Sequence, residues 1–117
     1  MIDLHRKRRS TARRSPKWPA LEKRHLKSAP HCAVCGTTEK CVPHHIAPVH
    51  IDPSRELDPA NLITLCPPHH LLCGHLMLWA AYNPDVVQDC AVWQSKIAKR
   101  RKAAQPDPPL NAGVMVA

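Results

Sequence analysis

Apolar residues recur along the chain with spacings that predict three helices and two short strands between residues 16 and 102. The first helix is expected to end near Ser28, before an Ala-Pro pair, and a proline near its start suits the first helical turn. Trp18, Leu21 and Leu26 give this helix a modest apolar face. The pattern therefore predicts a helix that packs one side against a small core.

Two short stretches between the helices are typical of strands. Residues 40–46 predict the first strand, and Pro43 favours an edge position because proline has no N–H for the strand ladder. Residues 47–60 are rich in Pro and Asp, which predicts a loop. Residues 61–65 contain two β-branched residues and predict the second strand.

Two further helices are expected after the second strand. The first starts at Cys66-Pro67-Pro68 and runs to about Tyr82. The second starts at Asn83-Pro84, with Asn as N-cap and Asp85 near the positive end of the helix dipole, and runs to about Lys102. Its apolar positions repeat at i, i+4, i+7 and i+11, and we expect all four to contact the core: Val86, Cys90, Trp93 and Ile97.

Length and composition indicate one small domain that needs stabilisation beyond its apolar core. The chain has 117 residues, no Phe, three Trp and one Tyr. Residues 1–15 and 103–117 lack periodic apolar positions, so we expect a disordered basic arm and a disordered tail around a domain at 16–102. A core of roughly 85 residues with few aromatics is thin, and a structural metal would stabilise it. The expected fold class is a small, metal-stabilised α+β domain.

Charge is distributed unevenly. Residues 1–29 carry a net charge of +8, residues 30–95 a net charge of −4, and residues 96–102 five positive charges. Basic segments on both sides of an acidic centre indicate a polyanion, and nucleic acid is the natural partner; a merely solubilising tail is the alternative. The candidate phosphate-binding residues are Arg6, Lys7, Arg8, Arg9, Arg13, Arg14, Lys96, Lys99 and Arg100. A membrane partner is not expected, because the arm has no apolar face and the chain no spanning segment.

The cysteines and histidines predict metal binding rather than disulfides. The basic start is not followed by the apolar run of a signal peptide, so a reducing cytoplasm is expected. Two pairs with a two-residue spacing predict a tetrahedral structural zinc site: Cys32, Cys35, Cys66 and His69. Two ordinary thiol pairs are the alternative. Cys73, one helical turn after His69, competes as a ligand, but a buried apolar role is favoured.

Four more polar residues are left over by such a zinc site. His44 and His45 stand together at a strand end, and neighbours on a strand point to opposite sides, so they have different roles. His70 follows the zinc ligand on the helix and points away from it. Asn61 precedes the second strand, where its amide can bind loop backbone. Taken singly, each suits a surface histidine or a turn cap.

The joint pattern over residues 30–80 resembles the HNH endonucleases, in their zinc-stapled form with a treble-clef-like ββα-metal core. A softer likeness, over residues 69–101, is to small HNH proteins of phages and prophages. Two departures are a histidine at His69 in place of a cysteine and a histidine at His44 in place of Asp. Some members carry a third metal-binding histidine where Gly74 stands, and on a regular helix His75 would face elsewhere.

The resemblance implies a metal-dependent endonuclease that hydrolyses phosphodiester bonds of double-stranded DNA with low intrinsic sequence specificity. It implies that His44 and His70 hold a catalytic divalent ion (Mg²⁺, Mn²⁺, Ni²⁺ or Zn²⁺) and that His45 is the general base. Asn61 would orient the loop or the His45 ring. Two alternatives remain: a non-catalytic zinc-containing DNA-binding module, and an adaptor that joins a protein partner in a phage-type DNA-processing complex.

Overall fold

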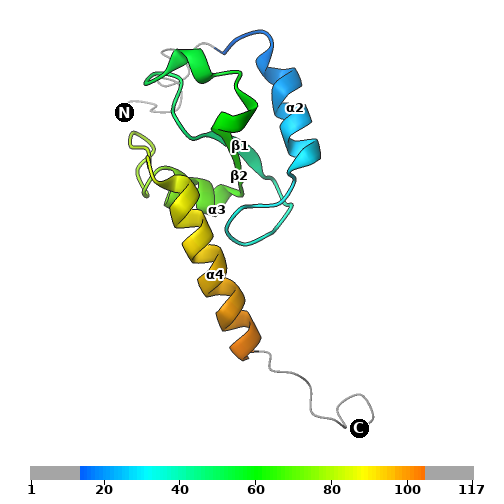
Figure 1. Ribbon diagram of the computed structural model, residues 1–117, viewed down its shortest axis with the longest axis vertical. Coiled ribbons are helices and arrows are strands. Elements are labelled where there is room, and N and C mark those ends of the chain that lie inside the picture. The colour runs from blue at the N-terminus through cyan, green and yellow to red at the C-terminus, as the bar shows by residue number, and fades with distance from the viewer. Residues whose placement is uncertain (1–13, 105–117) are drawn as a thin grey trace, which may run out of the picture.

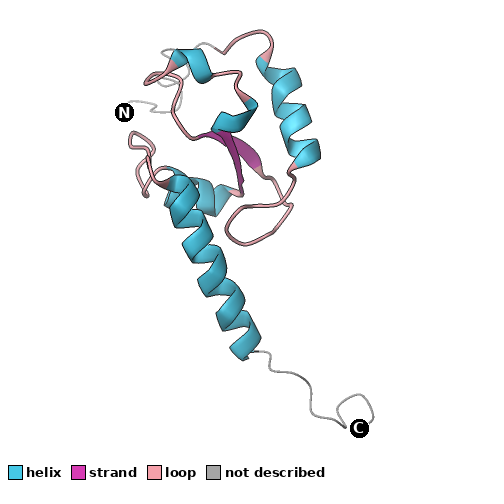
Figure 2. Cartoon of the chain, viewed as in Figure 1, coloured by secondary structure: helices cyan, strands magenta, loops and turns pink. Residues whose placement is uncertain are grey.

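A two-stranded antiparallel sheet lies between the helices of the fold (Figure 1). The computed structural model describes residues 14–104. Strand β1 (Val42–His45) pairs with β2 (Leu62–Leu65), and the register sets His44 opposite Ile63. The two strands and flanking helices of Figure 2 confirm a small α+β fold.

The strands are shorter than expected at their starts. Lys40 has a φ of 55°, so the chain is still turning there and β1 begins two residues after the predicted start. Pro43 lies in β1 opposite Thr64 and is buried. Both strands of this two-stranded sheet have an unpaired edge, and the edge position predicted for Pro43 is confirmed.

The loop between the strands contains two short 3₁₀ helices, η1 (Pro53–Arg55) and η2 (Pro59–Asn61). An aspartate precedes each of them, and its carboxylate accepts a backbone N–H from inside the turn. These caps are Asp52 and Asp58. The predicted loop is therefore held in a defined shape by local hydrogen bonds.

Helix α2 (Trp18–Ser28) covers one side of the sheet, as its apolar face predicts. Trp18 and Leu21 are buried. A polar chain also joins the helix to β2: His25 Nε2 lies 2.8 Å from Thr64 Oγ1, and that hydroxyl donates to the carbonyl of Ala29 at 2.6 Å.

The single helix expected from Cys66 to about Tyr82 is wrong. A short α3 (Pro67–His69) passes into one π-helical turn, η3 (His70–Gly74), and the helix ends there. Leu76 and Met77 have φ values of 54° and 67°, which a right-handed helix cannot accommodate. The Gly74 carbonyl instead accepts the N–H of Asn83 at 3.0 Å.

Helix α4 (Val86–Ala104) begins after a polar turn and projects from the rest of the fold (Figure 1). Asn83 Oδ1 accepts the N–H of Asp85 at 2.9 Å, close to its predicted capping role, but regular helix starts only at Val86. The helix also continues two residues into the predicted tail.

The prediction that four α4 residues contact the core is wrong for one of them. Val86 and Cys90 are buried, and Ile97 packs on the core at its edge. Trp93 is 43% exposed. The core is too small to cover it, because the buried side chains of α4 are confined to Val86 and Cys90 near its start.

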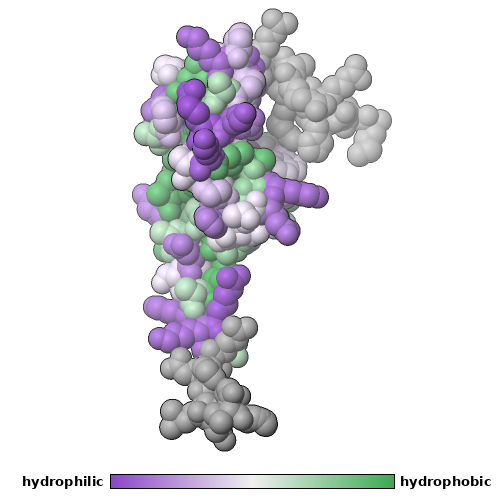
Figure 3. Space-filling view, turned by 90° about the vertical axis from the view of Figure 1, so that its right-hand side faces the viewer, coloured by the Kyte–Doolittle hydropathy of each residue, from purple (hydrophilic) through white to green (hydrophobic). Residues whose placement is uncertain are grey.

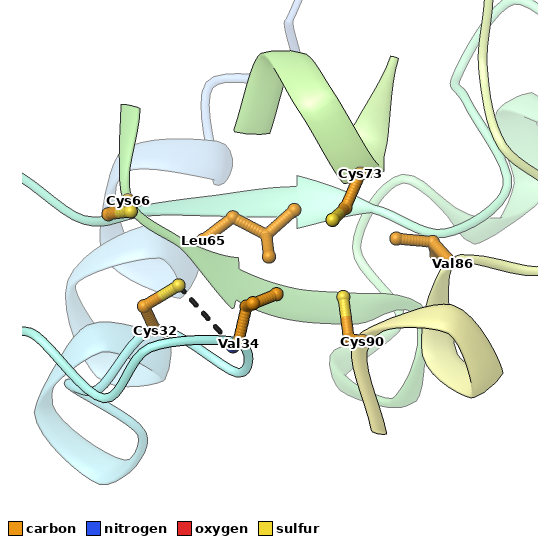
Figure 4. Close-up of a cluster of buried hydrophobic side chains, with 7 residues drawn as sticks. All are labelled: Cys32, Val34, Leu65, Cys66, Cys73, Val86 and Cys90. Carbon is orange, nitrogen blue, oxygen red and sulfur yellow. Dashed lines mark hydrogen bonds between the residues drawn. The ribbon is translucent and has the colours of Figure 1, made fainter. Parts of the chain in front are cut away.

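The core consists of two clusters. The larger joins the cysteine-bearing loops to β2, η3 and α4 (Figure 4), and its buried members are Cys32, Val34, Leu65, Cys66, Cys73, Val86 and Cys90. The smaller lies under α2 and contains Trp18, Leu21 and Leu62. Cys73 and Cys90 are thus buried apolar residues, as favoured for Cys73.

The arm expected at 1–15 lies outside the described residues except for 14 and 15, and the tail expected at 103–117 lies outside them from residue 105. Among the helices of the described part, none is long and apolar enough to span a membrane.

Candidate functional site

The first pair of candidate zinc ligands lies in a tight turn. Gly36, with a φ of 80°, donates its N–H to the carbonyl of Cys32 at 2.9 Å. The N–H of Val34 points to Cys32 Sγ at 3.4 Å, the contact drawn in Figure 4. This arrangement directs backbone donors at the Cys32 sulfur, which stabilises a thiolate.

The second pair lies where β2 passes into α3. Cys66 occupies the N-cap position of α3, and Pro67 follows in its first turn, as predicted. His69 is the last residue of that short helix. The junction therefore brings Cys66 and His69 back to the Cys32–Cys35 turn.

The four ligand atoms of Cys32, Cys35, Cys66 and His69 lie within 4.8 Å of one another, close enough to hold a metal ion. Cys35 Sγ lies 3.8 Å from Cys66 Sγ, and Cys32 Sγ lies 3.7 Å from His69 Nδ1. Around a tetrahedral zinc, with bonds of about 2.3 Å to sulfur and about 2.0 Å to nitrogen, ligand atoms lie roughly 3.5–3.8 Å apart. These spacings are consistent with structural zinc.

Two of these thiols have opposite pKa shifts. Burial raises the pKa of Cys66 to about 12. Burial acts in the same direction at Cys32, but backbone donors from Cys35, Cys66 and Val34 outweigh it and lower its pKa to about 6. The surroundings therefore favour the thiolate at Cys32, whereas metal binding must release the proton of Cys66.

A second cluster contains three histidines, His44, His70 and His75, whose ligand atoms also lie within 4.8 Å of one another. Nε2 of His70 and Nε2 of His75 are 3.3 Å apart. His44 Nε2 is buried and has no hydrogen-bond partner among the described residues. Three converging imidazoles with an unpartnered buried nitrogen fit a divalent transition metal.

The expectation that His75 faces away from this cluster is wrong. It rested on a regular helix, where a residue five positions after His70 lies on another face. The chain instead forms the wider η3 turn and leaves the helix at Gly74, which brings His75 beside His70. Neither the π turn nor the two left-handed residues after it has a sequence signal that would have found this ligand.

Neighbouring groups orient the cluster. His75 Nδ1 donates to the carbonyl of Ala81 at 2.7 Å, so in the neutral form of this ring the lone pair lies on Nε2. The Trp79 ring packs on His70 and His75, with centroids 5.1 and 4.9 Å away. Gly74 gives His44 its space, because an added Cβ would lie 3.1 Å from that ring.

The surroundings of the cluster favour neutral histidines, which can bind a cation. Burial, together with the nearby imidazoles of His70 and His75, lowers the pKa of His44 to about 3. Burial and His75 lower the pKa of His70 to about 4. Both rings are therefore neutral near pH 7 and present lone pairs.

His45 lies on the opposite side of β1 from His44, against α2 and the loop. Its Nε2–H donates to the carbonyl of Glu56 at 2.9 Å, and its Nδ1 accepts from Arg14 Nη1 at 3.2 Å. The ring lies 4.7 Å from the Trp18 ring. Burial lowers the pKa of His45, and the positive charge of Arg14 acts in the same direction. The ring is thus a neutral base whose Nδ1 is directed at the Arg14 guanidinium.

Asn61 holds the loop that supports His45. It is fully buried; its Oδ1 accepts the Ala47 N–H at 2.8 Å, and its Nδ2 donates to the carbonyls of Ala47 and Arg55 at 3.0 and 3.1 Å. The Arg55 carbonyl immediately precedes Glu56, whose own carbonyl binds His45. Asn61 therefore connects both ends of the loop. Its link to His45 is indirect and runs through the backbone at Arg55 and Glu56.

The candidate phosphate-binding residues are only partly described. Arg14 is exposed and also stacks over Trp18, with its guanidinium carbon 4.9 Å from the ring centroid. Lys96, Lys99 and Arg100 are exposed on α4. Figure 3 shows hydrophilic side chains gathered around the C-terminal end of that helix. The other five, Arg6, Lys7, Arg8, Arg9 and Arg13, lie outside the described residues.

Comparison with protein-family models, with curated proteins and with solved structures found no match to this chain.

Proposed function

We propose that this protein is a metal-dependent endonuclease of the HNH type, which hydrolyses DNA phosphodiester bonds with low intrinsic sequence specificity. One observation carries the proposal. Consecutive residues of β1 serve two sets of contacts: His44 joins three converging imidazoles, while His45 is held as a neutral base. A zinc module that only folds has no need of either arrangement.

In this proposal His44, His70 and His75 hold the catalytic ion, and the Cys/His site with zinc holds the fold as a ββα-metal core. A bound divalent cation would supply charge stabilisation at the phosphate and the leaving oxygen. An all-histidine ligand set favours Ni²⁺, Zn²⁺ or Mn²⁺ over Mg²⁺, which prefers oxygen ligands.

His45 acts as general base at Nδ1 and takes a proton from the attacking water. The Glu56 carbonyl fixes the tautomer and stabilises the imidazolium that forms. Arg14 donates to the same Nδ1 in this structure. A DNA phosphate is a stronger partner for a guanidinium than a neutral imidazole. Substrate would therefore draw Arg14 to the phosphate and leave Nδ1 to the water.

Basic residues on both sides of the domain supply the sequence-independent affinity for DNA. Lys96, Lys99 and Arg100 on α4 and the residues of the N-terminal arm would contact backbone phosphates. Such contacts position a duplex and carry little sequence information, which supports low intrinsic specificity.

Cleavage of supercoiled plasmid tests the proposal. We expect the zinc-loaded protein to nick plasmid with Mn²⁺, Ni²⁺ or Zn²⁺ and to be inhibited by chelator. His45→Ala should lower the rate by about 100-fold or more, because general-base catalysis contributes roughly 10²–10⁴-fold. His50→Ala is the matched control, since His50 is an exposed histidine of the neighbouring loop.

Two results would contradict the proposal. One is undiminished cleavage by a folded, zinc-loaded His45→Ala variant. The other is salt-sensitive DNA binding by the wild type without cleavage in any metal. The second would favour the non-catalytic DNA-binding module, which is also consistent with Arg14 occupying the lone pair of His45.

A further inference from the structure

An exposed apolar loop follows the third histidine directly. Leu76, Met77 and Leu78 are 52%, 62% and 61% exposed. Residues 71–84, which include them, contain no charged side chain. A small domain with few buried apolar residues thus leaves three large ones in solvent beside its candidate metal centre.

The loop has a fixed shape. The N–H of Met77 donates to the carbonyl of Leu71 at 2.8 Å, and the N–H of Leu78 donates to that of His75 at 3.0 Å. Leu76 and Met77 both have left-handed φ values, which are unfavourable for bulky residues. Backbone strain of this kind concentrates at functional sites, and here it turns the side chains outward from a pinned backbone.

The loop follows His75 directly in the chain, which limits the ligands that can contact it. Leu76 to Leu78 follow His75 by one to three residues, so they lie close to any DNA phosphate that the three-histidine cluster binds. The absence of acidic side chains in the loop means that it does not repel the DNA backbone. The place of the loop beside the cluster and its lack of negative charge favour a DNA duplex as its occupant.

We propose that Leu76, Met77 and Leu78 form an apolar wedge that enters the base step beside the scissile phosphate and partly unstacks it. This inference rests on the proposed nuclease function. Apolar side chains inserted at a base step cost unstacking energy but bend the duplex toward the protein. The wedge thereby opens the backbone at the phosphate to be cleaved, independently of base identity.

The test uses a duplex with 2-aminopurine, whose emission rises on unstacking, next to the mapped cleavage position. Binding is measured in the His45→Ala background, where cleavage should be slow enough for the emission to be read before the DNA is cut. Met77→Ser with Leu78→Ser is compared with Val87→Ser with Val92→Ser, a matched pair on α4 that is 47% and 51% exposed. Cleavage in the His45 background is measured on a paired duplex and on one with a small bulge at the same step.

We expect the loop variant to lose the emission rise and to cleave the paired duplex about tenfold more slowly or worse, given the size of base-contact effects. The bulged duplex, already unstacked, should restore its rate to near that of wild type, and the α4 variant should match wild type throughout. Equal emission and equal rates for all variants would overturn the wedge while leaving the nuclease intact.

Two other results would also overturn the wedge. A wild type that cleaves no DNA removes the nuclease function and the wedge with it. Loop-dependent binding to anionic phospholipid vesicles, with both DNA readouts unchanged in the loop variant, would assign the loop to a lipid surface.

Discussion

His44 has the most unfavourable surroundings of the described histidines. Its ring is buried between Gly74 and two other imidazoles, and Nε2 has no hydrogen-bond partner among the described residues. A buried polar atom left in this state costs about 1–3 kcal/mol. A cation bound by the cluster would offset that cost, so metal should stabilise the fold as well as serve the chemistry.

His75→Gln tests the three-histidine cluster. We expect its affinity for Ni²⁺ or Zn²⁺ at this cluster to fall by roughly 100-fold, because losing a direct ligand costs at least as much as losing an outer-shell partner. Isothermal titration of protein already loaded with one structural zinc measures it, with His50→Gln as control. An unchanged affinity would show that His44 and His70 suffice.

The lowered pKa values of His44 and His70 predict acid sensitivity without metal at the cluster. As pH falls below 6.5, the unfolded chain takes up protons at these residues, while the folded protein does not until about pH 3–4. The free energy of unfolding should therefore fall across that window, by up to about 1.4 kcal/mol per pH unit for each group. Urea unfolding from pH 7 to 5 should give a shallower slope for His44→Asn. Equal slopes would contradict this linkage.

At the scale of elements, two short segments position the candidate functional histidines. Adjacent residues of β1 point to opposite faces, which separates a candidate metal ligand from a candidate base by one peptide bond. The α3–η3 segment makes a similar division: His69 joins the candidate zinc ligands and His70 the three-histidine cluster. A shift of either element by one residue would leave a histidine at only one of its two positions.

Helix α4 contacts the core through few residues. Two neighbouring valines test how much each position contributes to stability. Val86 is fully buried, whereas Val87 is 47% exposed. We expect Val86→Ala to lower the free energy of unfolding by about 2 kcal/mol and Val87→Ala to change it by less than about 0.5 kcal/mol. Urea denaturation of both variants provides the comparison. Similar losses would mean that α4 packs more extensively than its exposure indicates.

At the scale of the whole molecule, the Cys/His site and the apolar core share residues. Cys32 and Cys66 are candidate zinc ligands and also members of the larger apolar cluster (Figure 4). The same site ties the loop before β1 to the start of α3. A metal there would therefore hold together segments that so small an apolar core cannot secure alone.

Removal of the structural metal should unfold the protein. Chelation, or Cys35→Ser, is expected to abolish the cooperative unfolding transition and plasmid cleavage together, with recovery when zinc returns to the chelated wild type. Circular dichroism and zinc stoichiometry follow the change. Cys41→Ser is the control, because Cys41 lies outside the four-ligand group. A chelated protein that still unfolds cooperatively would show that the core suffices.

Local patterns determined much of this protein. The strands near 42–45 and 62–65, the helix after Asn83 and the four candidate zinc ligands follow from proline and asparagine positions, β-branched residues and paired spacing. Each signal acts over a few residues, where backbone sterics and capping hydrogen bonds decide the outcome.

Only the tertiary structure decided the rest. The helix after Cys66 ends at Gly74, where the Asn83 N–H binds the Gly74 carbonyl and the missing side chain leaves space for the His44 ring from another element. That ending brings His75 to the cluster, and the small core leaves Trp93 in solvent. These outcomes depend on packing between segments distant in sequence, which no local spacing encodes.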